Sequence, residues 1–238
     1  MKNRLGRISV GVLGGMMALV AIFLVLSRTL GNIHFPCLYA GNTILYWREQ
    51  LYSRDAGASN VALATVNSQI IPQLRNTMFH DTRDSGLRMS LINVLNGLPG
   101  VQIYYMQARE RRAFAIRNLG DFGPAARAAV PDVIKALENE EPEIKVAAIS
   151  TLGKLQADPD KVIPILIRYL DDEHCDAVAA GALAEFGSLA KPAVPKLLPL
   201  LNAKDDDDQV AARDALLKID PEAAAKAGVV SRAAKAGK

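Results

Sequence analysis

The sequence predicts an all-α protein in which an N-terminal transmembrane helix precedes an α-solenoid of stacked helical hairpins. A long uncharged apolar run lies near the N-terminus, and the C-terminal half repeats one pattern of apolar residues. The chain is 50% hydrophobic but only 5% aromatic, so its apolar residues are mainly Ala, Leu, Val and Ile. This composition suits closely packed helices.

Residues 1–29 are predicted to form a signal anchor. The run from Ile8 to Leu26 contains no charged residue, and a helix of this length just spans the hydrocarbon core of a bilayer. We therefore expect the lipid bilayer to be a partner of this segment. The alternative is a signal peptide whose cleavage leads to a secreted protein.

The charges on either side of this run predict its orientation. Lys2, Arg4 and Arg7 precede it, whereas only Arg28 follows closely. By the positive-inside rule, the N-terminus then lies in the cytoplasm and the remainder of the chain outside it, in the periplasm. The predicted protein crosses the membrane once.

Residues 30–106 are predicted to form a divergent helical N-terminal cap that shields the first repeat. Apolar residues at helical spacing occur in three stretches, which begin near Ile44, Ser59 and Leu87, but they do not keep the register of the repeats. The glycines and proline of residues 97–100 predict the break between the cap and the repeats.

Residues 107–221 contain the repeats. Pro131, Pro164 and Pro195 each follow a β-branched residue and lie 33 and 31 residues apart. Apolar residues recur around each proline at positions i, i+3, i+4 and i+7, which form one face of a helix. The three sets are Val130, Val133, Ile134 and Leu137; Ile163, Leu166, Ile167 and Leu170; and Val194, Leu197, Leu198 and Leu201.

A second set of positions keeps the same period and predicts another helix in each unit. One column of this set is entirely alanine and another entirely leucine, namely Ala115, Ala148, Ala179 and Ala212, and Leu119, Leu152, Leu183 and Leu216. Small side chains allow two helices to approach closely. Each unit is therefore predicted to be a helical hairpin that must stack on its neighbours to bury its apolar face.

The predicted hairpins cover residues 107–138, 141–171 and 174–202, and a terminal helix covers residues 206–220. The acidic residues 205–208 at the start of this helix suit the positive end of its dipole. Residues 222–238 are rich in Ala, Gly and Lys, and we expect a flexible basic tail.

Four strings within these units resemble HEAT repeats of the subtype named after phycobilisome lyases. They are residues 119–123 (LGDFG), 129–131 (AVP), 182–187 (ALAEFG) and 193–195 (AVP). The start of the cap, Leu45-Tyr46-Trp47, resembles the juncture in membrane-anchored bacterial HEAT-repeat proteins. The resemblance implies an α-solenoid of HEAT-type hairpins, a scaffold that serves adaptors, regulators and a few enzymes.

The sequence predicts no catalytic, metal or cofactor site. His34, His80 and His174 are scattered, and no Glu directly follows any of them, although a HEAT-repeat hydroxylase would need several His-Glu pairs. No GxSxG, Walker or HExxH motif occurs. With 28 basic and 25 acidic residues, the charge is too nearly balanced to predict a nucleic-acid partner.

The resulting hypothesis is a non-enzymatic, membrane-tethered scaffold that binds an unidentified protein or peptide. A curved stack would present its second helices along an inner surface. The candidate binding residues lie off the apolar face of these helices and are Asp132, Lys135, Glu138, Arg168, Tyr169 and Lys196. The alternative, implied by the repeat subtype, is a subunit of a chromophore lyase or of another HEAT-repeat enzyme. Such lyases act in the cytoplasm, whereas the predicted orientation places the repeats outside.

The orientation can be tested with a reporter that is active only outside the cytoplasm. Fused after Lys238, it should be active, because moving Lys2, Arg4 and Arg7 across the bilayer is opposed during insertion. Changing these three residues to Glu should reduce or scramble the activity. If only a cytoplasmic reporter is active at the same position, the predicted orientation is wrong.

Overall fold

A computed structural model describes residues 38–39, 42–97 and 105–229. The predicted anchor, with its run from Ile8 to Leu26, lies outside the described residues, as does most of the predicted tail. Among the helices that the structure describes, none combines the length and the apolar character needed to cross a membrane. The described residues are mostly helical and form successive hairpins, as expected for an α-solenoid.

The chain divides into two compact units. The helix α5 (Gly86–Asn96) belongs to one of them. The other comprises residues 39–84 and 104–238 and contains the remaining described helices.

The larger unit begins with the helices of the predicted cap. Two short strands, β1 (Leu38–Tyr39) and β2 (Asn42–Thr43), precede α2 (Ile44–Leu51). The hydroxyl of Thr43 accepts a hydrogen bond from the Tyr46 backbone N–H at 3.1 Å and so caps α2. A longer run of helix follows, formed by α3 (Ala56–Thr65), the π-helix η1 (Val66–Ile70) and α4 (Ile71–His80).

The hairpins follow in the predicted order. The first consists of α6 (Ala108–Asp121), the 3-10 helix η2 (Gly123–Ala129) and α7 (Val130–Ala136). The second consists of α8 (Pro142–Leu155), α9 (Pro159–Arg168) and η3 (Tyr169–Asp171). The third consists of α10 (Asp176–Glu185), η4 (Gly187–Ala193) and α11 (Val194–Leu200), and α12 (Asp206–Ile219) and α13 (Pro221–Lys226) follow.

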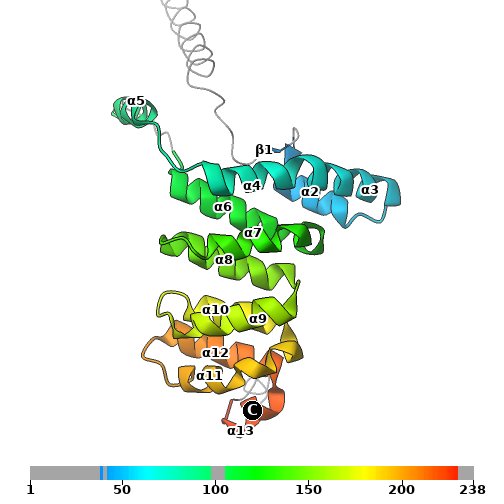
Figure 1. The fold of residues 1–238 in the computed structure, drawn as a ribbon, viewed down its shortest axis with the longest axis vertical. Helices are drawn as coiled ribbons and strands as arrows, with labels where there is room; N and C mark the ends of the chain where they lie inside the picture. The colour runs from blue at the N-terminus through cyan, green and yellow to red at the C-terminus, as the bar shows by residue number, and fades with distance from the viewer. Residues whose placement is uncertain (1–37, 40–41, 98–104, 230–238) are drawn as a thin grey trace, which may run out of the picture. The chain divides into compact units, whose positions relative to one another are not determined.

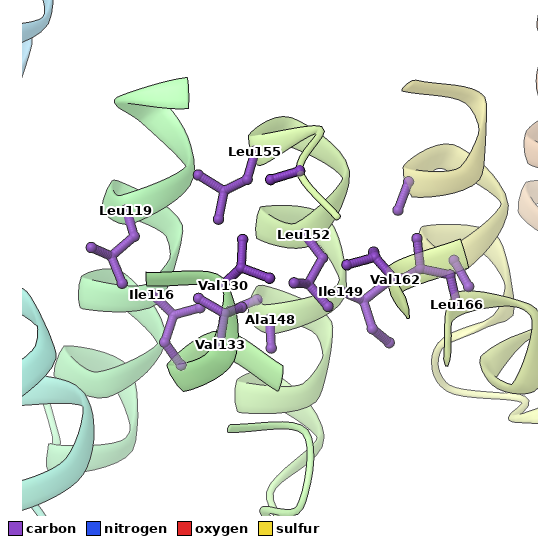
Figure 2. Close-up of a cluster of buried hydrophobic side chains, with 14 of the residues drawn as sticks. Ile116, Leu119, Val130, Val133, Ala148, Ile149, Leu152, Leu155, Val162 and Leu166 are labelled. Atoms are coloured by element: carbon purple, nitrogen blue, oxygen red, sulfur yellow. The ribbon is translucent and has the colours of Figure 1, made fainter. Parts of the chain in front are cut away.

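The first helices of the hairpins stack on one another in chain order. From α4, the row continues through α6, α8 and α10 to α12 (Figure 1). All residues of the predicted alanine and leucine columns are fully buried. Side chains of the first two hairpins meet in one apolar cluster, in which Ile116, Leu119 and Leu152 lie between the helices with Val130 and Val133 (Figure 2).

The turns that end the first helices differ between units. Gly123 and Gly187 have positive φ angles of 52° and 54°, a conformation that glycine adopts without steric cost. In the second unit the same position is Gln156, with φ of 47°, and its side-chain amide donates to the backbone carbonyl of Glu185 at 2.6 Å. This hydrogen bond ties the unusual turn to the next unit.

The helices that carry the prolines are less completely buried than their apolar spacing predicts. Val133, Leu166 and Leu197 are fully buried. Ile134 and Ile167 are only half-buried, and Leu198 is 36% exposed. These helices are covered mainly from the side of the first helices, so that their i+4 positions lie at the edge of the core.

Two helical glycines offer a matched test of this packing. A Cβ atom at Gly153 in α8 would lie 2.7 Å from the Cα of Ala182 in α10, whereas one at Gly181 would meet nothing within 4 Å. We expect Gly153→Ala to lower the free energy of unfolding by about 1–3 kcal/mol through overpacking. Gly181→Ala should raise it by about 0.5–1 kcal/mol, because alanine favours the helix.

Urea unfolding of the purified protein would measure both effects. The gain in helix propensity is common to the two variants, so the difference between them reports the contact between α8 and α10. Equal effects would show that these helices do not approach closely at Gly153.

Candidate partner-binding surface

The structure places the six predicted surface residues along the second helices of the hairpins. Asp132 and Lys135 lie in α7, and Glu138 follows its end; Arg168 is the last residue of α9, Tyr169 begins η3 and Lys196 lies in α11. Four of these residues contact the neighbouring hairpin or, in the first hairpin, the cap.

Two of these contacts join α7 to the cap. The Asp132 carboxylate forms an ion pair with Arg75 of α4, with 2.5 Å between Oδ2 and Nε. The Lys135 ammonium lies 5.5 Å from the centre of the Phe79 ring, also in α4. The first repeat is therefore fixed to the cap partly by residues that the sequence indicated only as a binding surface.

The next two contacts join the later units. The Tyr169 hydroxyl donates to the Leu137 carbonyl at 3.3 Å, and burial raises the pKa of this hydroxyl, which favours its protonated form. Lys196 pairs with Asp171 across the junction of the second and third units. Glu138 and Arg168 are exposed.

A row of apolar residues, which we call the apolar ladder, runs beside these contacts. The three prolines that mark the repeat are all exposed. Three positions further along each helix, and so on the same face, lie the half-exposed branched residues described above. The apolar ladder consists of Pro131 and Ile134 in α7, Pro164 and Ile167 in α9, and Pro195 and Leu198 in α11.

In the sequence these prolines mark the register of the repeats, and the apolar spacing predicts that the branched residues lie in the core. The sequence does indicate that these residues could be exposed, because each second helix is short and carries apolar residues at both i+3 and i+4. A helix covered from one side buries a limited arc, and the i+4 residues fall at its border. Proline adds apolar area at such a surface without side-chain entropy to lose on binding.

Charges of alternating sign mark a second row, at the ends of the first helices. The Lys154 ammonium lies 2.8 Å from the Asp121 carboxylate, and the Lys218 ammonium lies 3.2 Å from that of Glu185. These four residues occupy equivalent positions of successive units. Exposed ion pairs of this kind contribute at most about 1 kcal/mol each.

A carboxylate pair lies where α10 meets α12. Asp176 is 8% exposed, and its carboxylate accepts the Ala177 backbone N–H at 2.9 Å. Burial, and then the negative charge of Asp176, raise the pKa of Asp208. The neighbouring Cys175 is also buried, which raises the pKa of its thiol to about 11 and keeps it protonated at neutral pH. Within the described ranges, no group of three or more His, Cys, Asp or Glu residues is placed to hold a metal ion.

Comparisons with known proteins support the repeat assignment. Residues 106–185 match the family described as HEAT repeats. The curated proteins contain no significant match to this chain.

A solved structure is also similar, the complex of CpcE and CpcF of phycocyanin lyase from Nostoc sp. PCC7120. The similarity has a TM-score of 0.43 and a sequence identity of 23%, and it covers 76% of this chain. It covers 66% of the other chain, so this protein spans just under two thirds of that length. Similarity at this level assigns neither an activity nor a partner.

The Asp176–Asp208 pair predicts a pH-dependent effect. A carboxyl group whose pKa is raised in the folded state stabilises that state below its unfolded pKa, and the contribution is lost as the pH rises through the folded pKa. We expect the melting temperature of Asp208→Asn, relative to wild type, to increase from about pH 3 to about pH 7.

The matched control is Asp206→Asn, which lies in the same first turn of α12 and removes a similar interaction with the helix dipole. Thermal melts across this pH range compare the two variants. The same pH dependence in both would show that the effect does not come from Asp176.

Proposed function

We propose that the chain is a non-enzymatic scaffold, tethered to the membrane by its N-terminal segment, that binds a protein or peptide along the apolar ladder. The observation that carries this proposal is the recurrence of exposed prolines and partly exposed branched residues at equivalent positions of three successive repeats. A single exposed apolar residue is ordinary on a protein surface. A row in the register of the repeats forms an extended site that matches the architecture of a solenoid.

The spacing of the units suits an extended segment of the partner. Packed helices lie about 8–10 Å apart, and an extended chain advances about 3.1–3.4 Å per residue. A bound segment would then meet one unit of the ladder about every third residue. We propose a partner segment with apolar side chains at that interval, flanked by polar residues that meet Glu138 and Arg168.

The tether and the location are further parts of the proposal. The uncharged run from Ile8 to Leu26 and the basic residues before it favour a single membrane crossing, with the repeats outside the cytoplasm. In this arrangement the scaffold would hold its partner at the membrane surface.

The test is affinity capture of the detergent-solubilised protein, followed by binding measurements with the partner that it identifies. Ile167→Lys and Leu198→Lys each place a charge on the ladder while the aliphatic stem preserves part of the packing. Combined, they should weaken binding about tenfold or more. Leu189→Lys is the matched control, because Leu189 is 61% exposed but lies in η4, outside the ladder.

Loss of the partner in the ladder variant, with retention in the control, would support the site. Equal binding by all three proteins would show that the partner binds elsewhere. Transfer of a chromophore to a captured protein by the purified chain would instead favour the lyase-like alternative.

A further inference from the structure

The helix α5 exposes its apolar residues to an unusual degree. Leu87 is 78% exposed and Val94 68% exposed, and Leu91 lies between them at helical spacing on the same face. None of the side chains that the structure describes in α5 is buried. Its apolar residues are Leu87, Met89, Leu91, Ile92, Val94 and Leu95.

The charge of this part of the chain is one-sided. From Ser85 to Arg109 the sequence contains no Asp or Glu, and Arg88 is the charged residue of α5, whereas Arg83 before the helix is followed by Asp84. An amphipathic helix with basic and without acidic residues is complementary to a bilayer that contains anionic lipids. The chain as a whole has nearly balanced charge, so the bias is local.

The length of α5 favours a lipid surface over two other occupants. Its 11 residues extend about 16 Å, roughly half of the hydrocarbon core, which is too short to cross a membrane. Pairing with a second copy of α5 would bury fewer than two heptads, and isolated helices this short associate weakly. A helix that lies in the plane of the headgroups needs neither the length to cross the membrane nor the length to form a stable helix pair.

A polar cluster in the larger unit, which we call the Arg111 clasp, holds both ends of the segment that contains α5. The Arg111 guanidinium donates two hydrogen bonds of 2.6 Å to Asp81 and one of 3.2 Å to Asp84. Asp84, directly before this segment, also accepts the backbone N–H of Ala108 at 2.9 Å. Tyr105, just after the segment, donates to Asp84 at 3.2 Å, and its ring lies 5.4 Å from the guanidinium carbon. The residues on either side of the segment are therefore held together within the larger unit.

We propose that α5 binds the surface of an anionic bilayer as an in-plane amphipathic helix, with Leu87, Leu91 and Val94 inserted below the headgroups. This inference rests on the proposed membrane tether, which would keep α5 at a high local concentration near the bilayer. It would give the scaffold a second membrane contact and so restrict how the apolar ladder is oriented.

Quenching by brominated acyl chains tests the insertion directly in the full-length protein. The chain is reconstituted into phosphatidylcholine vesicles with and without phosphatidylglycerol, and tryptophan is introduced as Val94→Trp. Leu189→Trp is the matched control, since it is similarly exposed but lies on the repeats. The native Trp47 is common to both proteins and 9% exposed.

We expect stronger quenching of Val94→Trp than of Leu189→Trp, and more of it when phosphatidylglycerol is present. Arg88→Gln in the Val94→Trp protein should shift the balance between bound and free α5 about fivefold toward the free state. Quenching no stronger than in the control, or independent of phosphatidylglycerol, overturns the inference. Cross-linking between α5 helices of two copies, without quenching, would identify a second copy as the occupant.

Flotation with the vesicles at high salt separates this inference from the tether. A protein that floats but is not quenched at residue 94 has the tether and lacks the α5 contact. A protein that does not float at high salt, yet is quenched when added to anionic vesicles at low salt, has the α5 contact and lacks the tether.

Discussion

The repeat domain depends on the packing of α6, α8, α10 and α12 against one another. A single helical hairpin cannot bury its apolar face, so the stability of each unit comes from its neighbours. The fully buried alanine column permits close approach, and at Gly153 the backbones of α8 and α10 come so near that a Cβ atom would overlap Ala182. The leucine column fills the remaining space, and each of these residues contributes about 1.5–3 kcal/mol by its burial.

This packing also determines what remains exposed. Because the second helices are covered mainly by the first helices, their i+4 residues and their prolines stay at the surface as the apolar ladder. The contacts of Asp132, Tyr169 and Lys196 run beside it and connect successive units. Such partly exposed interactions contribute little energy, so the packing of the first helices mainly sets the position of each repeat relative to the next. The ladder is therefore presented on a surface of defined geometry.

In the sequence, the segment that contains α5 separates the cap from the repeats. The Arg111 clasp joins the residues on either side of this segment, and the bidentate contact with Asp81 together with the charge of that carboxylate raises the pKa of Arg111 further above its usual value. Beside the clasp, the Glu110 carboxylate accepts the Gln107 backbone N–H at 2.8 Å and caps the start of α6. The repeats can thus begin in register whatever α5 contacts.

The sequence by itself determined the helical hairpins, their register and the buried alanine and leucine columns, because a period repeated over several units requires equivalent environments. The tertiary structure decided which apolar residues of the second helices are buried, since Val133 and Ile134 lie within the same apolar arc and only the position of the neighbouring helices separates them. It also decided the partners of Asp132 and Arg111, which are distant in sequence. For α5 the sequence predicted a helix, but only three-dimensional contacts separated it from the compact unit of the other cap helices. The reason is that helical periodicity indicates an apolar face and does not indicate what covers that face.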